Sequence, residues 1–164
     1  MYIILQGVIR TNDDATSTFV NSIVAGSRVV NVATVDSGSL SANNILIEDN
    51  IRFESGFYAT SAGASMRLNN LTYRRNSNDR DPWIGVYADG GSNVIVLRTT
   101  FEENQHMIWG ILSETSGARE TRVTARDLRF EGNTDFVSKC CANGGLAPLA
   151  VAFPLIACLT ITSL

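Results

Sequence analysis

The sequence predicts an all-β fold in which successive turns of the chain stack on one another as a parallel solenoid of short strands. The first observation is internal repetition: aromatic residues recur at long, unequal intervals, at Phe53, Tyr73, Phe101 and Phe130. The second is a hydrophobic period of two around these residues, which is typical of strands. The third is an asparagine three residues after each of the last three aromatics, at Asn76, Asn104 and Asn133. Repetition with a period of roughly 20–50 residues indicates a solenoid.

Each repeat is predicted to contain about three short strands separated by bends. In residues 92–101, Val94 and Val96 alternate with polar or exposed positions, and Thr99 and Phe101 resume the alternation after a two-residue corner. Matching residue types stand at the same offsets in the neighbouring repeats. These are Met66, Leu68 and Leu71 before, and Val123, Ala125 and Leu128 after. A further apolar piece follows each aromatic and ends in a turn cluster such as residues 89–92.

Strands this short do not form a stable isolated sheet, so one repeat has to stack on the next. Equivalent strands then lie parallel, about 4.8 Å apart, and each inward residue meets its counterpart in the next coil. We expect a stack of the four aromatic residues, and a ladder of the three asparagines in left-handed backbone conformations at the corners. Phe53 joins the stack only if a one-residue bulge adjusts Ile45 and Ile47. A β-sandwich with coincidentally similar strands is the alternative.

Two tetrapeptides at the corners carry a resemblance to a known class of repeats. Phe101-Glu102-Glu103-Asn104 and Phe130-Glu131-Gly132-Asn133 resemble the F-x-x-N element of polymorphic outer membrane protein repeats. The chain as a whole resembles a right-handed parallel β-helix of the pectin-lyase-like class, with about five to six coils. We assign residues 1–143 to this β-helix domain, with the clearest repeats over residues 45–137.

The composition is that of a folded domain without a nucleic-acid-binding face. The chain has 164 residues, of which 45% are apolar and 18% charged, and its formal net charge is −3. A broad nucleic-acid face requires an excess of basic residues, so nucleic acid is not an expected partner. The hydrophobic stretch at residues 1–5 is too short for a secretory signal peptide. The resemblance nevertheless implies an extracellular or cell-surface location.

Residues 144–164 form an apolar C-terminal tail without a charged side chain. A membrane-spanning helix needs roughly 20 consecutive apolar residues, so this run is long enough to be a candidate membrane anchor. Pro148 and Pro154 interrupt the run and argue against a regular membrane-spanning helix. The other interpretations are a segment that covers the open end of the solenoid and an irregular tail.

The resemblance also implies where a site would lie. Members of the pectin-lyase-like class that cleave polysaccharides carry acidic and basic side chains on the outward face of a parallel sheet. In the predicted register, the binding face contains Arg52, Thr72, Arg74 and Thr100, and the catalytic candidates are Glu102, Arg129 and Glu131. The two glutamates are expected on adjacent coils, about 4.8 Å apart, close to the carboxyl separation of about 5–5.5 Å in retaining glycosidases. A solvated ladder of carboxylates balanced by arginines is the alternative interpretation.

No metal or cofactor site is predicted. His106 is the only histidine, so a pair of histidines cannot bind a metal ion. Acidic loops at residues 12–14 and 78–81 offer oxygen ligands to Ca²⁺, but neither follows the spacing of a calcium-binding loop.

Three functions are compatible with the sequence. The first is a non-catalytic β-helix segment whose flat face binds a polysaccharide or a surface protein. The second is a polysaccharide lyase or glycoside hydrolase acting on acidic polysaccharides such as pectin. The third is a structural spacer that associates with a membrane through residues 144–164. We favour the first, because small-molecule sites are usually concave and the predicted face is flat.

Overall fold

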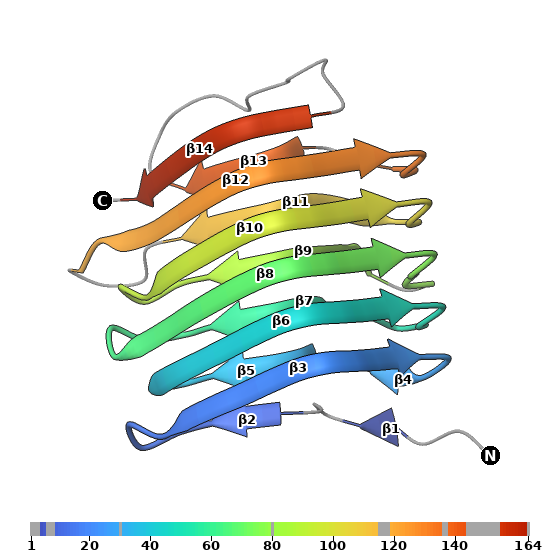
Figure 1. The fold of residues 1–164 in the computed structure, drawn as a ribbon. Coiled ribbons are helices and arrows are strands. Elements are labelled where there is room, and N and C mark those ends of the chain that lie inside the picture. Colours follow the sequence, from blue (N-terminus) through green and yellow to red (C-terminus); the bar gives the residue numbers. More distant parts are fainter. Residues whose placement is uncertain are drawn as a thin grey trace.

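Every secondary-structure element of the described chain is a β-strand. The computed structural model describes residues 4–5, 9–29, 31–79, 81–114, 119–135, 138–143 and 155–163. The strands within these ranges (Figure 1) are β1 (Ile4–Leu5), β2 (Ile9–Thr11), β3 (Thr16–Ala25), β4 (Arg28–Val29), β5 (Asn31–Val35), β6 (Gly38–Glu48), β7 (Ser55–Ala59), β8 (Ala64–Arg74), β9 (Trp83–Ala88), β10 (Asn93–Glu102), β11 (Met107–Glu114), β12 (Thr121–Glu131), β13 (Ser138–Asn143) and β14 (Leu155–Ser163).

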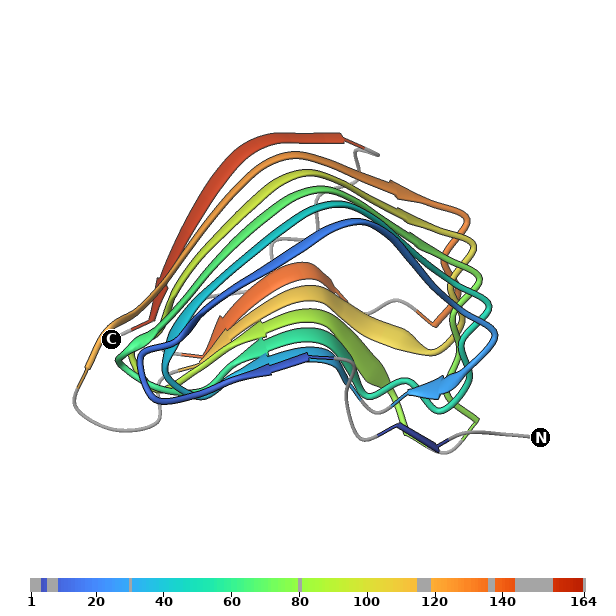
Figure 2. The same cartoon turned by 60° about the horizontal axis from the view of Figure 1, so that its bottom comes forward.

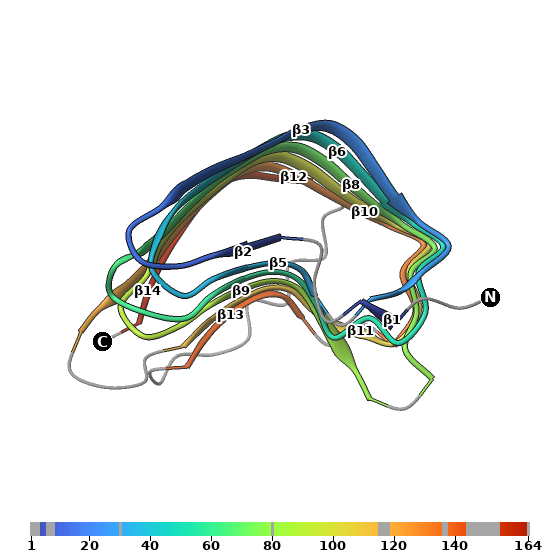
Figure 3. The same ribbon diagram turned by 90° about the horizontal axis from the view of Figure 1, so that it is seen from below.

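These strands wind as a β-solenoid of about four turns. The long sheet has the spatial order β14-β12-β10-β8-β6-β3, and the short sheet has the order β13-β11-β9-β7-β5-β2. All neighbours in both sheets are parallel except β12 and β14. Seen from below, the strands of each sheet lie over one another and the two sheets face each other (Figure 3). The parallel solenoid is therefore confirmed, and the alternative of a β-sandwich is excluded.

The number of coils is lower than the predicted five to six. Five parallel strands of the long sheet, from β3 to β12, correspond to four complete turns. Equivalent positions along this sheet are Ser22, Ile45, Leu71, Thr99 and Leu128. The turns therefore lengthen along the chain. Hydrogen-bonded asparagines on successive coils show the same trend, with sequence separations of 23, 26, 28 and 29.

An aromatic stack runs through the core, as predicted for three of its four expected members. Tyr73, Phe101 and Phe130 occupy one column of the long sheet. Their ring centroids are 4.7 Å and 4.8 Å apart, and the ring planes differ by 13° and 8°. All three side chains are buried, so each pair adds stacking to the burial of apolar area.

Phe53 does not belong to this stack, and the predicted register before Tyr73 is wrong. Ile47 pairs with Tyr73 directly, without a bulge. Phe53 lies beyond the end of β6 and packs edge-on against Trp83, with ring centroids 4.9 Å apart. An aliphatic residue fills the aromatic column in this coil, so the aromatic character of Phe53 was a misleading guide to register.

Glycines in the short sheet leave room for the aromatic rings of the long sheet. The register places Gly56, Gly85 and Gly110 in one column. A Cβ atom on Gly56 would lie 2.4 Å from Cε1 of Tyr73, and one on Gly85 would lie 2.4 Å from Cε1 of Phe101. Neither contact is sterically allowed, so a ring in the long sheet requires a glycine opposite it.

The coil before these three has neither a glycine nor a ring at these two positions. There the glycine column holds Val32, and the aromatic column holds Ile47. Both side chains are fully buried. Each of these four coils thus combines either a glycine with a ring or two aliphatic residues, which keeps the cross-section of the core filled.

The predicted asparagine ladder is present, with Asn50 as an additional member. The Nδ2 group of Asn50 donates to Oδ1 of Asn76 at 2.9 Å, Asn76 to Asn104 at 3.1 Å, and Asn104 to Asn133 at 2.9 Å. Each amide also donates to a backbone carbonyl of an earlier coil at 2.8–3.0 Å. Because Asn50, Asn76 and Asn104 are fully buried, these hydrogen bonds satisfy groups that water does not reach.

The left-handed backbone conformation falls one residue before each asparagine, and not on the asparagine as predicted. The residues with positive φ at these corners are Asp49, Arg75, Glu103 and Gly132. The chain turns at these residues, and the following asparagine side chain then points inward, where its amide reaches the neighbouring coils. An inward amide explains why the ladder is buried.

Residues 155–163 of the apolar tail form β14, which runs antiparallel to β12. Thr121 of β12 pairs with Ser163, and Arg129 pairs with Leu155. Residues 144–154 and Leu164 lie outside the described part of the chain. None of the described residues belongs to a helix with the length and apolar character needed to cross a membrane.

Candidate functional site

Six of the seven residues predicted for the site lie on the outward side of the long sheet. Thr72, Thr100 and Arg129 form one column, and Arg74, Glu102 and Glu131 form the next. Glu102 and Glu131 are direct register partners on adjacent strands, as predicted. These six positions follow from the shared offset to Tyr73, Phe101 and Phe130.

Arg52 is not part of this surface. The register places Leu46 in the Thr72 column, whereas Arg52 lies in the corner after β6 with a positive φ of 59°. Its Nε atom is 3.8 Å from a carboxylate oxygen of Asp79. The misplacement has the same cause as that of Phe53, because both predictions assumed a turn shorter than the real one.

The charged column on this face consists of carboxylates and guanidinium groups that are paired with one another. Arg74 lies 2.5 Å from Glu48 and 3.7 Å from Glu102, between the two carboxylates. Arg129, in the neighbouring column, lies 2.7 Å from Glu131 on its own strand. This pairing of opposite charges is typical of a solvated charge ladder, in which each exposed pair contributes little stability.

A further ion pair extends this column at its edge. Arg75 contacts Asp49 with its Nε atom at 2.8 Å. The hydrogen bond from Arg75 holds the pKa of Asp49 below its ordinary value of 3.8. Asp49 therefore stays ionised at all pH values at which carboxylates ordinarily carry charge.

The long strands bend at an exposed column of polar residues. These residues all have positive φ and are Asn21, Asn44, Asn70, Arg98 and Asp127. The bend is visible in Figure 2, where every strand of the long sheet changes direction at the same point. Asparagine tolerates this conformation better than most residues, which accounts for its use in three of the five parallel strands.

The three asparagines of the bend form an amide ladder on the outside of the protein. Nδ2 of Asn70 donates to Oδ1 of Asn44 at 3.0 Å, and Nδ2 of Asn44 donates to Oδ1 of Asn21 at 2.8 Å. All three residues are exposed. Each amide has two N–H donors and an oxygen with two lone pairs, so a ladder bond uses only part of its capacity.

A shallow depression of about 300 Å³ follows this ladder. We call it the asparagine trough; its lining residues are Asn21, Ser22, Ile23, Asn44, Ile45, Leu46, Asn70 and Thr72. Ile23 is 68% exposed, which is high for a large apolar side chain in a folded protein. The trough therefore combines a row of amides with an adjacent apolar row.

A second surface feature, which the sequence patterns of the long sheet did not predict, lies on the short sheet. Tyr58 and Tyr87 are register partners and stack with ring centroids 4.7 Å apart and an interplanar angle of 2°. The Tyr87 hydroxyl donates to a carboxylate oxygen of Glu114. Burial raises the pKa of both phenols, and the hydrogen bond to Glu114 raises that of Tyr87 further.

A signal for this pair was present in the sequence. Residues 56–59 read Gly-Phe-Tyr-Ala and residues 85–88 read Gly-Val-Tyr-Ala, so the short sheet repeats its own tetrapeptide. An alignment on the aromatics of the long sheet alone does not reveal it. In the part of the chain that the structure describes, no three histidine, cysteine, aspartate or glutamate side chains converge on a common metal position.

No family model, curated protein or solved structure matches this chain. The assignment of the fold therefore depends on strand register, on the aromatic stack and on the two asparagine ladders.

Proposed function

We propose that this chain is a non-catalytic β-solenoid segment that binds an extended polysaccharide along the outer face of the long sheet. The observation that carries the proposal is the asparagine trough. A sugar ring has hydroxyl groups at its edge and C–H groups on its faces. A row of amides beside a row of aliphatic side chains offers a partner to each.

The spacing of the trough suits a polymer better than a single sugar. Neighbouring coils repeat every 4.8 Å or so, which is close to the length of one sugar unit in an extended glycan. Asn21, Asn44 and Asn70 would then meet successive units of one chain. The hydrogen bonds between their side chains hold the amides in place before binding, which lowers the entropic cost of association.

The predicted binding face extends the trough along the same direction. Thr72 lines the trough, and Thr100 and Arg129 follow it in the same column. A hydroxyl and a guanidinium group at these positions would contact further units, including acidic ones. A surface protein is the other partner considered for this face.

We include in this proposal a family relationship and a cellular location for the protein. The F-x-x-N elements at Phe101 and Phe130 support a relationship to polymorphic outer membrane protein repeats and to the pectin-lyase-like class. Such a relationship favours an extracellular or cell-surface location, where polysaccharides are available. Association with a membrane through residues 144–164 is a further part of this proposal.

The experiment compares binding of the full chain to polygalacturonate and to neutral glucans by isothermal titration calorimetry. In Asn44→Gly the amide is removed, and glycine keeps the left-handed backbone. Asp127→Gly places a glycine at the same bend outside the trough and is the matched control for the backbone; neutral glucans serve for this comparison, because Asp127→Gly also removes a charge. We expect at least a tenfold loss of affinity for Asn44→Gly only. Equal affinities of the two variants, or the absence of binding to every glycan, would refute the proposal.

The register of Glu102 and Glu131 favours a second candidate function. Two carboxylates on adjacent strands, with Arg129 beside them, suit a polysaccharide lyase or glycoside hydrolase acting on acidic polysaccharides. Incubation of the full chain with polygalacturonate tests this second function, because cleavage produces new reducing or unsaturated ends. Their formation by the unaltered chain and their loss in Glu131→Gln would support an enzyme over a binding protein.

A further inference from the structure

The stack of Tyr58 and Tyr87 ends at a small residue. In the register of the short sheet, Arg10, Thr34, Tyr58 and Tyr87 occupy one column. Tyr87 covers one face of the Tyr58 ring, and the position on the other side belongs to Thr34. Among the described residues, no second ring stacks on this face of Tyr58.

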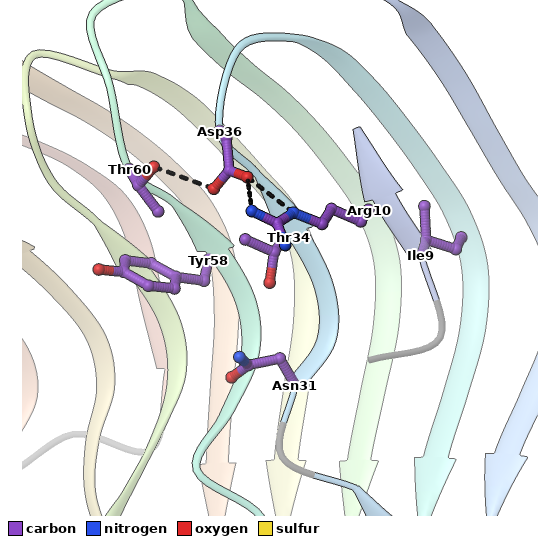
Figure 4. A pocket seen from close by; sticks show the side chains of 7 residues that line it. All are labelled: Ile9, Arg10, Asn31, Thr34, Asp36, Tyr58 and Thr60. Atoms are coloured by element: carbon purple, nitrogen blue, oxygen red, sulfur yellow. Dashed lines mark hydrogen bonds and ion pairs between the residues drawn. The ribbon is translucent and has the colours of Figure 1, made fainter. Parts of the chain in front are cut away.

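A hollow of about 400 Å³ lies in front of Thr34 (Figure 4). Its lining consists of Ile9, Arg10, Asn31, Thr34, Asp36, Tyr58 and Thr60. Figure 4 shows Thr34 between Tyr58 on one side and Arg10 on the other. We call this space the tyrosine hollow.

The spacing of the strands leaves room for one flat ring in the tyrosine hollow. The strands that carry Arg10 and Tyr58 are two coil steps apart, which corresponds to about 9.6 Å between their backbones. A ring in van der Waals contact with a surface on each side, at about 3.5–4.0 Å, needs about 7–8 Å. A ring placed over Thr34 would continue the stack that Tyr58 and Tyr87 begin.

The far wall of the hollow is a guanidinium group held in position. Nε and Nη2 of Arg10 lie 2.8 Å and 2.6 Å from the same oxygen of Asp36. The other oxygen of Asp36 accepts a hydrogen bond from the Thr60 hydroxyl at 3.3 Å. A planar guanidinium stacks on aromatic faces, and its attraction is strongest for electron-rich rings.

The lining of the hollow includes hydrogen-bonding groups that form its rim. Asp36 provides carboxylate oxygens, and Asn31, Thr34 and Thr60 provide amide and hydroxyl groups. A ligand that carries a hydroxyl donor on its ring can bond to this rim while its faces contact Tyr58 and Arg10. A saturated ring or an aliphatic chain lacks the electron-rich face that the guanidinium favours.

We propose that the tyrosine hollow binds a phenol ring, sandwiched between Tyr58 and Arg10 with its hydroxyl group at the Asp36 rim. This site lies on the short sheet and is distinct from the asparagine trough on the long sheet. The phenol can be a free compound or the side chain of a tyrosine in a peptide. The proposal does not depend on polysaccharide binding.

The test is a titration of the full chain with p-cresol, with N-acetyltyrosinamide and with N-acetylleucinamide, followed by nuclear magnetic resonance. We expect saturable binding of the two phenols and at least tenfold weaker binding of the leucine derivative. Tighter binding of p-cresol would assign a free phenol as the ligand, and tighter binding of N-acetyltyrosinamide would assign a peptide side chain. Equal binding of all three compounds would overturn the proposal.

Substitutions in the tyrosine hollow test whether the phenol binds there. Thr34→Tyr supplies a ring from the chain itself and is expected to reduce phenol affinity at least tenfold, whereas Thr34→Val leaves the hollow open and changes it less than twofold. If Thr34→Tyr does not fold, Tyr58→Leu makes the same test by removing the stacking partner. Unchanged phenol affinity in the folded variants would refute the site.

The proposals for the asparagine trough and for the tyrosine hollow can be tested independently of each other. Asn44→Gly lies in the asparagine trough and is expected to leave phenol binding unchanged. Thr34→Tyr is expected to leave polysaccharide binding unchanged. A result in which one ligand binds and the other does not therefore identifies which proposal is wrong.

Discussion

Replacing Gly85 with alanine tests whether the glycine column exists to accommodate the aromatic stack. The added Cβ atom would lie 2.4 Å from Cε1 of Phe101 and 2.5 Å from the carbonyl oxygen of Gly110. Ordinary carbon–carbon contacts are about 3.5–4.0 Å. The ring cannot easily retreat, because it stacks between Tyr73 and Phe130 at 4.7 Å and 4.8 Å. Overpacking of this kind costs about 1–3 kcal/mol, and two simultaneous overlaps favour the upper end.

A second substitution separates the ring from the backbone contact. Phe101→Ile reproduces the aliphatic residue found at Ile47 and alone should cost about 2 kcal/mol of buried apolar contact. In the double variant the overlap with the ring is gone, and only the contact with Gly110 remains. We therefore expect the double variant to be more stable than the sum of the single effects predicts, by about 1–2 kcal/mol.

The measurement is urea unfolding of the four proteins of this cycle, followed by circular dichroism. Gly85→Ala combined with Ile47→Val is the control pair, because Ile47 lies two coils, or about 9.6 Å, from Phe101 in its column. That pair should be additive within about 0.5 kcal/mol. Additivity of Gly85→Ala and Phe101→Ile as well would show that the backbone contact alone requires the glycine, and the size complementarity would be refuted.

Three further predictions concern single side chains. Asn76→Ala should lower the free energy of unfolding by about 3 kcal/mol or more, because it leaves several buried hydrogen-bonding groups without a partner. Urea unfolding measures this loss, and the exposed control Asn93→Ala should change the free energy of unfolding by no more than about 0.5 kcal/mol. Similar effects of the two substitutions would contradict the role of the ladder. Burial raises the pKa of Tyr73 well above 10.0, so only the unfolded state loses this proton just above pH 10 and stability falls as pH rises from there. Tyr73→Phe should therefore cost about 1 kcal/mol at pH 7, through the lost hydrogen bond to the carbonyl of Gly85, and the deficit should shrink in urea unfolding between pH 9 and pH 11; a constant deficit would contradict the argument. Thr34→Tyr should raise stability by about 0.5–1.5 kcal/mol through one more stacked pair, and a lower thermal midpoint would contradict it.

The columns around Tyr73, Phe101 and Phe130 were predictable because their turns have nearly equal length and the same residue types recur. The prediction failed one coil earlier, where Ile47 replaces an aromatic residue and the turn is shorter. Register in a solenoid depends on which side chain fills a column in three dimensions. A large aliphatic residue fills it as well as a ring does when the opposite position compensates.

Two other features were beyond the reach of sequence patterns. The contact between Gly85 and Phe101 is between residues of different sheets, so no periodicity within one strand indicates it. The direction of β14 was also hidden, because an uncharged run of residues carries no signal for parallel or antiparallel pairing. The exposed ladder at Asn21, Asn44 and Asn70 became recognisable only once the turn lengths were known.

One corner of the solenoid shows where this architecture accepts additional chain. Between equivalent positions of the two sheets, the segment from Asn76 to Ile84 is longer than the segment from Asn50 to Ser55. The extra residues leave the paired strands untouched, and the described parts of this loop, residues 76–79 and 81–83, project from the corner in Figure 3. Because closing a longer loop costs little additional free energy, this corner is a natural point for grafting a foreign peptide. An inserted segment there would be displayed on a rigid scaffold without altering the asparagine trough or the tyrosine hollow.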